Sequence, residues 1–79
     1  MTKLVKSIAK SLVDHPDKVV VTDRTDERGE VVTLQVASSD MGKVIGKQGR
    51  IAKALRTVVK AAATKQNRRV SVEIISEDE

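Results

Sequence analysis

The chain has 79 residues, enough for one domain with a small core, and it has no cysteine, which excludes disulfides and thiolate metal sites. It also has no Phe, Trp or Tyr, which excludes RNA-binding modules that stack bases on aromatic rings. No apolar run approaches the roughly 18 residues of a membrane span, and lysines interrupt the apolar stretch that a secretory signal would need. We therefore expect a cytoplasmic protein that does not enter membranes.

Basic residues are concentrated in the middle of the chain. Nine of the 15 Lys and Arg residues lie between Met41 and Arg69, whereas all 11 Asp and Glu residues lie outside that segment. The net charge of +4 therefore understates how basic the middle of the chain is. Such segregation favours a polyanion as partner for this segment. The alternative is a basic helix face that is simply solvated.

The first predicted element is an amphipathic helix over residues 3–13. Its apolar residues recur with helical spacing, and lysines and serines occupy the opposite face. The helix should end at His15, because a residue that precedes a proline is disfavoured in helical geometry. His15 is the only histidine, and at a helix end it is better suited to capping or solvent contact than to catalysis.

Two strands joined by a polar turn are predicted next. Residues 18–22 are short and β-branched, which indicates a strand. Residues 26–29 form a polar turn that closes on a glycine. Residues 32–36 alternate apolar and polar side chains, the pattern of a half-buried strand. The three segments together predict a β-hairpin.

A helical region follows, and glycines interrupt it. Residues 38–40 supply N-cap side chains for a short helix that runs through Ile45. After Gly46 and Gly49, a second helix of about four turns is expected to bury the apolar face Ile51, Leu55, Val58, Val59 and Ala62. Residues 65–69 form a basic connection, residues 70–74 alternate as a last strand, and residues 77–79 form an acidic tail that we expect to be frayed.

The predicted order is α-β-β-α-α-β in a single α+β domain that covers residues 1–79. The simplest topology is a three-stranded sheet with three helices on one face. The two strands that flank the helix pair should be parallel neighbours, because a crossover connection joins them. The opposite face of the sheet should be solvated.

Gly46 and Gly49 are costly in a helical pattern, since each destabilises a helix interior by about 1 kcal/mol relative to alanine. A P-loop does not explain them, because three residues rather than four separate Gly42 from Gly46, and Gln48 stands where a Ser or Thr should hold magnesium. The Rossmann fingerprint Gly-x-Gly-x-x-Gly is also absent. A helix–turn–helix fits less well, because the helix before the glycines is very short and two strands precede it.

Little in the sequence points to an enzyme. The carboxylates near the hairpin turn are better explained by solubility and turn chemistry than by a metal site. We therefore expect no catalytic residues, no metal, no cofactor and no small-molecule substrate.

The segment Val44-Ile45-Gly46-Lys47-Gln48-Gly49-Arg50-Ile51 resembles the signature of the KH domain, Val-Ile-Gly-x-x-Gly followed by an aliphatic residue. The last aliphatic residue, Ile51, stands one position earlier than in many members, which have it at the position of Ala52. The element order matches the type II (bacterial) KH arrangement, and the resemblance covers essentially the whole chain. Within that fold the chain is most similar to the KhpA family of small bacterial RNA-binding proteins.

The resemblance implies that the Gly46–Gly49 loop clamps the backbone of single-stranded RNA. Glycines let a sugar-phosphate chain come close, and the helix that starts near Arg50 directs its amides and positive dipole at the same place. The aliphatic floor for the bases would face Leu34 or Val36 of the neighbouring strand. The RNA-binding residues that we expect are Lys43, Val44, Ile45, Gly46, Lys47, Gln48, Gly49, Arg50, Ile51, Arg68 and Arg69.

The resemblance also implies partners. KhpA-like proteins are associated with self-pairing and with KhpB, a larger KH-containing RNA-binding protein, so a homodimer or a heteromer with a KhpB-like protein is expected. The family is linked to RNA chaperone activity and post-transcriptional regulation, to cell elongation and shape, and to cell-wall homeostasis. The alternative is a dimerising scaffold whose KH surface mainly binds a protein partner.

Overall fold

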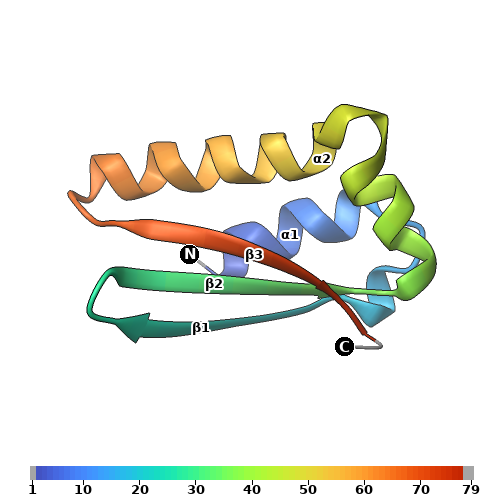
Figure 1. Ribbon diagram of the computed structural model, residues 1–79, viewed down its shortest axis with the longest axis horizontal. Helices are drawn as coiled ribbons and strands as arrows, with labels where there is room; N and C mark the ends of the chain where they lie inside the picture. The colour runs from blue at the N-terminus through green and yellow to red at the C-terminus, as the bar shows by residue number, and fades with distance from the viewer. Residues whose placement is uncertain (1, 78–79) are drawn as a thin grey trace.

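The computed structural model describes residues 2–77, except for the side chains of Lys47 and Gln48. Its elements are helix α1 (Thr2–Leu12), the short 3-10 helix η1 (Pro16–Lys18), strands β1 (Val20–Asp26) and β2 (Gly29–Val36), helix α2 (Ser38–Lys65) and strand β3 (Val70–Ser76). Helix α2 is continuous but changes direction, so it supplies two helical segments (Figure 1). The predicted α-β-β-α-α-β order and the single α+β domain are therefore confirmed. Residues 78 and 79 of the expected acidic tail lie outside the described part.

The sheet has the order β1-β2-β3, with β2 in the centre. Strands β1 and β2 pair antiparallel from Val20↔Gln35 to Asp26↔Gly29, which makes β1 longer than the predicted 18–22 segment. Strands β2 and β3 pair parallel, with Val32 opposite Val72, as the crossover predicts. Both long helices lie on one face of the sheet, with α1 beside β1 and α2 over β3 (Figure 1).

The core lies between this sheet face and the two long helices. The alternation of β2 places Val32, Leu34 and Val36 in the core, as predicted. Helix α1 contributes Val5 and Ala9. The second segment of α2 buries the stripe Ala52, Leu55, Val59 and Ala63. The predicted stripe is wrong in detail: Val58 is exposed and Ala62 only partly buried, because the buried face is rotated toward Ala63.

The change of direction in α2 occurs at the glycines, and its cause is local. Gly49 has a φ of 69°, in the left-handed region that only glycine adopts without strain. Gly46 has no positive φ and lies within the helix. One glycine therefore makes the turn, and the conformation of the backbone does not require the other.

The start of α2 differs from the prediction. Its N-cap is Ala37, and no side chain makes a capping hydrogen bond there. Asp40, which was expected to help cap this helix, instead directs its side chain toward the end of α1. No helix within residues 2–77 is long and apolar enough to cross a membrane.

Candidate nucleic-acid interface

A groove runs along the side of the molecule where α2 lies over β3. Its first part is a hollow of about 390 Å³ lined by Ile45, Gly49, Ala52, Lys53, Arg56 and Ile74. The helix supplies one wall and the edge strand supplies Ile74. We call this part the turn end, because it begins where α2 changes direction. The strand that faces it is β3 rather than the expected β2, whose Leu34 and Val36 are completely buried.

A second hollow, of about 450 Å³, continues the groove. Arg56 lines both hollows, and the second extends past Lys60 and Thr64 to Arg68 and Arg69. We call this part the arginine end. Helix α2 runs beside the groove from Gly49 to Thr64, so at about 1.5 Å per residue the groove is about 22 Å long. It therefore connects the glycine turn with the predicted basic connection.

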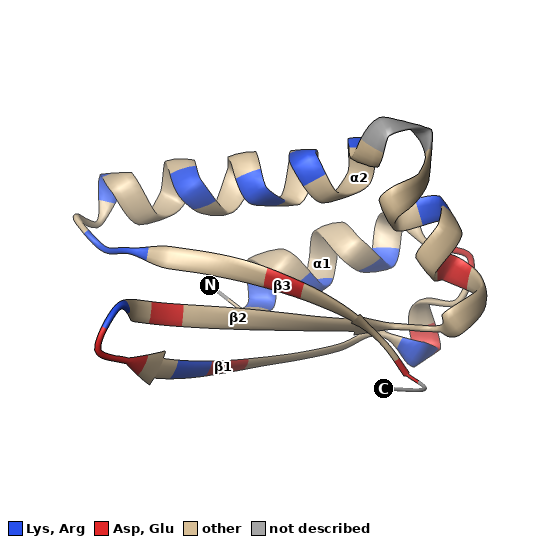
Figure 2. Ribbon diagram, in the orientation of Figure 1, with Lys and Arg blue, Asp and Glu red and all other residues tan. Residues whose placement is uncertain are grey.

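Three basic residues line this groove that were not among the predicted site residues: Lys53, Arg56 and Lys60. They follow Gly49 at intervals of four, three and four residues, which places them on one face of a helix. This spacing could have indicated from the sequence that the three residues share a face with Gly49 and so belong to the candidate site. Figure 2 shows lysines and arginines recurring along this segment of α2.

The predicted aliphatic residues divide by burial. The side chain of Val44 is 0% exposed and packs in the core, so it supports the turn from inside rather than facing a ligand. Ile45, its neighbour, is 55% exposed and lines the groove. Ile51 is partly buried against the core. Ala52, at the position where many KH domains have their aliphatic residue, is buried and also lines the groove.

The glycines of the predicted clamp have open surroundings. A Cβ atom added at Gly46 or Gly49 would meet no described atom within 4 Å outside its own stretch of helix. Arg50 is exposed at the start of the second segment of α2. The side chains of Lys47 and Gln48, which complete the clamp, lie outside the described part of the chain.

Two predicted basic residues have acidic partners. Lys43 Nζ lies 3.0 Å from Asp14 Oδ1, in an exposed ion pair between α2 and the end of α1. Arg68 Nη2 donates to Glu30 Oε1 at 2.6 Å, and the Glu30 side chain is only 8% exposed. Arg69 lines the arginine end of the groove and makes no ion pair with any residue that the structure describes.

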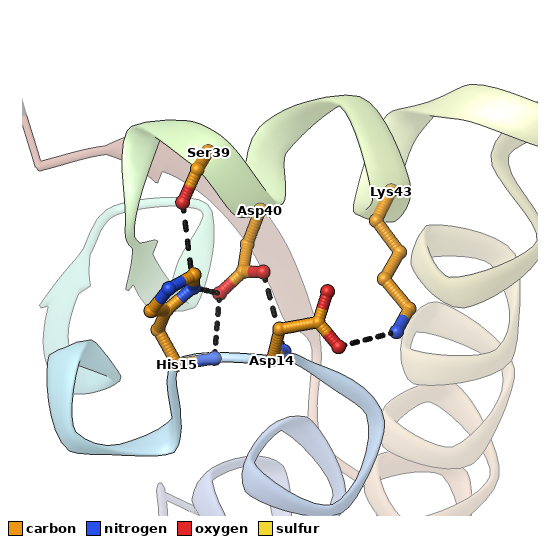
Figure 3. A network of polar contacts seen from close by, with 5 residues as sticks. All are labelled: Asp14, His15, Ser39, Asp40 and Lys43. Carbon is orange, nitrogen blue, oxygen red and sulfur yellow. Dashed lines mark hydrogen bonds and ion pairs between the residues drawn. The ribbon is translucent and has the colours of Figure 1, made fainter.

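Asp40 holds the first segment of α2 against the end of α1 (Figure 3). Its side chain is 1% exposed. Its carboxylate accepts hydrogen bonds from the backbone N–H groups of Asp14, at 3.2 Å, and His15, at 3.1 Å. His15 Nδ1 lies 3.3 Å from the same carboxylate and 3.3 Å from Ser39 Oγ. Asp40 therefore fixes the segment that leads to Gly46.

These contacts set the protonation of Asp40. Burial alone would raise the pKa of its carboxyl, but hydrogen bonds from Asp14 and His15 and the charge of His15 outweigh burial and lower the pKa below its ordinary value. The cluster is not a catalytic relay, because Ser39 and Asp40 both contact the same ring nitrogen of His15. Asp40 was missed as a structural residue because its partners lie 25 and 26 positions away in the sequence.

Curated relatives align over nearly the whole chain. The chain is 64% identical over 75 residues to the RNA-binding protein KhpA of Clostridium acetobutylicum and 61% identical over 75 residues to that of Clostridium perfringens; each alignment covers 95% of this chain and 100% of the relative. It is 49% identical over 75 residues to the RNA-binding protein KhpA of Listeria monocytogenes, covering 95% of this chain and 99% of the relative.

No solved structure matches the chain. A family model, however, agrees with the curated relatives. The model described as the KhpA/KhpB KH domain matches residues 2–74, a range that includes both strands of the hairpin, all of α2 and most of β3. The resemblance that the glycine segment and the element order suggested is therefore confirmed, and the chain belongs to the KhpA/KhpB KH-domain family.

Proposed function

We propose that the protein binds single-stranded RNA along the groove between α2 and β3, with the RNA backbone held at the Gly46–Gly49 turn. The names of the relatives support RNA as the ligand, since they are RNA-binding proteins aligned over 95% of this chain. The groove supports a nucleic-acid strand as ligand, because apolar residues and basic side chains line it together. Lys43, Lys47, Gln48, Arg50 and Arg69 are the proposed polar contacts.

The observation that carries this proposal is the glycine at position 46. It costs α2 helical stability, yet its φ is not positive and no packing neighbour would block a side chain there. Neither the fold nor the turn requires a glycine at this position. A ligand backbone that comes close to the helix does require one, because a Cβ atom would hold the sugar-phosphate chain at a distance.

The chemistry of the groove also predicts how the RNA is bound. With no aromatic ring to stack on, the apolar contacts open to bases are with aliphatic groups such as Ile45 and Ile74. Discrimination between sequences should therefore be low and charge should dominate. Three or four phosphate contacts, at about 0.7 counterions released for each, give a slope of roughly −2 to −3 for log affinity against log salt.

The test compares two identical residue pairs at opposite ends of one helical segment. Lys47-Gln48 lies at the turn and Lys65-Gln66 at the end of α2. We expect the double variant Lys47→Asp, Gln48→Asp to bind a fluorescent single-stranded RNA at least roughly tenfold more weakly, a loss of about 1.4 kcal/mol. The double variant Lys65→Asp, Gln66→Asp makes the same change in charge outside the groove lining. It should lower the affinity for RNA much less.

Equal losses in the two double variants would mean that only net charge matters, and the clamp would be rejected. Unchanged binding by a folded Lys47→Asp, Gln48→Asp variant would reject it as well. Circular dichroism of both variants establishes that each is folded before binding is measured.

Family membership supports finer proposals about partners and role. We propose that the protein acts in the cytoplasm as an RNA chaperone or post-transcriptional regulator linked to cell elongation and cell-wall homeostasis. A second domain would raise affinity, since one small groove offers few contacts. We propose that a second copy of the chain, in a homodimer, or a KhpB-like protein, in a heteromer, supplies this second domain. Mass measurement with and without RNA tests the assembly, and RNA crosslinks absent from residues 46–50 of a stable dimer would favour the scaffold alternative.

A further inference from the structure

The two consecutive arginines that close the groove have different surroundings. Arg68 donates to Glu30 at 2.6 Å, whereas Arg69 has no ion-pair partner within the described residues. Both lie in the connection between α2 and β3, and both are exposed overall. The difference is therefore one of partner and not of accessibility.

Glu30 contacts both arginines of this connection. Its side chain is 8% exposed, so its charge is largely withdrawn from water and depends on a partner. Its backbone N–H donates to the carbonyl oxygen of Arg69 at 2.9 Å. Two bonds, one from the side chain and one from the backbone, thus join the connection to the start of β2.

The neighbouring glycine strengthens this attachment. Gly29 has a φ of 124°, and a Cβ atom there would lie 2.6 Å from the Arg69 carbonyl oxygen. The start of β2 and the connection are therefore in direct backbone contact. The path of the connection, and with it the position of Arg69, is set by Gly29 and Glu30 rather than by the connection alone.

We propose that Arg68 is a positioning residue that holds the connection on Glu30, and that Arg69 alone of the pair contacts RNA phosphate. This proposal rests on the proposed function. Arg68 and Arg69 were both predicted to contact RNA, and here they have different roles. It follows that loss of Arg68 should act through the fold, and loss of Arg69 through the charge in the groove.

The experiment measures two properties of the variants Arg68→Gln, Arg69→Gln and the pair Glu30→Gln with Arg68→Gln. Thermal unfolding reports the attachment, and the salt dependence of affinity for a fluorescent single-stranded RNA reports phosphate contact. Arg69→Gln should keep the parent melting temperature and make the salt slope shallower by about 0.7. Arg68→Gln should melt about 5 °C or more below the parent, because Glu30 is left buried without its partner.

The paired variant separates the two roles of Arg68. Because the paired variant has no carboxylate at position 30, no buried charge is left without a partner. The melting temperature should therefore recover most of its loss, and the salt slope should stay at the parent value. A salt slope that becomes shallower by about 0.7 in this variant would make Arg68 a phosphate contact and overturn the proposal. An unchanged melting temperature in Arg68→Gln would overturn it too.

Failure of the proposed function would look different. If the parent protein binds no single-stranded RNA, both the proposed function and the contact role of Arg69 are rejected. The melting temperatures still decide whether Arg68 holds the connection.

Discussion

The two ends of the groove are held in place by different kinds of contact. At the turn end the chain offers glycine backbone and aliphatic side chains beside Lys53 and Arg56. The support of this end is Asp40, a carboxylate with almost no exposure that binds mainly backbone N–H groups. At the arginine end the chain offers charge, and its support is Glu30, held by an arginine that is half exposed. The turn end is therefore tied to its surroundings by a buried carboxylate, whereas the tie at the arginine end has one member half in solvent.

The difference in support matters because it predicts which end is more sensitive to substitution. A buried carboxylate that accepts two backbone hydrogen bonds leaves unsatisfied donors behind when it is removed. An ion pair with one exposed member loses much of its value to solvent screening. The structure therefore predicts a larger effect at Asp40 than at Glu30.

The largest effect is expected for Asp40→Ala. It leaves the N–H groups of Asp14 and His15 without their acceptor, and we expect the free energy of unfolding to fall by about 3 kcal/mol. Glu30→Ala, its counterpart at the arginine end, should cost about 1 kcal/mol. Urea denaturation of both variants measures the difference. A greater loss for Glu30→Ala would reverse the comparison between the two ends.

Gly46→Ala should separate binding from stability at the turn end. The added methyl group meets no described packing neighbour, so helix propensity should stabilise the fold by up to about 1 kcal/mol. Affinity for single-stranded RNA should fall roughly fivefold, about 1 kcal/mol, because the methyl group would lie where we propose that the RNA backbone approaches.

Gly42→Ala is the matched control for this change. Gly42 is also helical and open, but it lies four residues before Gly46, outside the Gly46–Gly49 turn. Its replacement should give the same gain in stability and leave RNA affinity unchanged. If Gly46→Ala behaves like Gly42→Ala in both measurements, the turn is not where RNA approaches.

Gly49→Ala should destabilise the fold, whereas Gly46→Ala should stabilise it. A φ of 69° costs an alanine about 1 to 2 kcal/mol, and relieving that strain would require α2 to change direction elsewhere. We expect a loss of about 1 kcal/mol in thermal or urea unfolding. A gain in stability like that expected for Gly46→Ala would show that the two glycines are not distinct.

The smallest effect is expected in the pH dependence. The folded-state pKa of Asp40 lies below its ordinary value, so its contribution to stability is complete above about pH 5 and is lost as pH falls through the ordinary pKa toward the folded one. His15, Asp14 and Lys43 are the other titratable groups of this cluster. Asp40→Asn should therefore lose less stability than the parent between about pH 5 and pH 3. Parallel curves for the two proteins would contradict this.

Much of the fold followed from local pattern. The alternation of residues 32–36 predicted the buried side of β2, and the helix pair between strands predicted the parallel pairing of β2 with β3. The position of the turn could be predicted because glycines are costly in a helix and so mark where a helix departs from regular geometry.

Parts of the candidate site depend on packing that no local pattern contains. Val44 and Ile45 are adjacent and equally apolar, and only the docking of α2 decides that one is buried and the other faces the groove. The roles of Asp40 and Glu30 depend on partners 25 or more positions away. The stripe of Lys53, Arg56 and Lys60 was visible in the spacing, but its position beside β3 was not.

NMR titration can locate bound RNA on the proposed site, the groove from the glycine turn to Arg69. The backbone amides of the ¹⁵N-labelled protein are followed while a short single-stranded RNA is added. We expect the largest shifts at residues 45–56, with smaller ones toward residue 69 and along β3, and little change in β1. Shifts concentrated on β1 and the open face of the sheet, with residues 45–56 unchanged, would mean that RNA binds outside the groove.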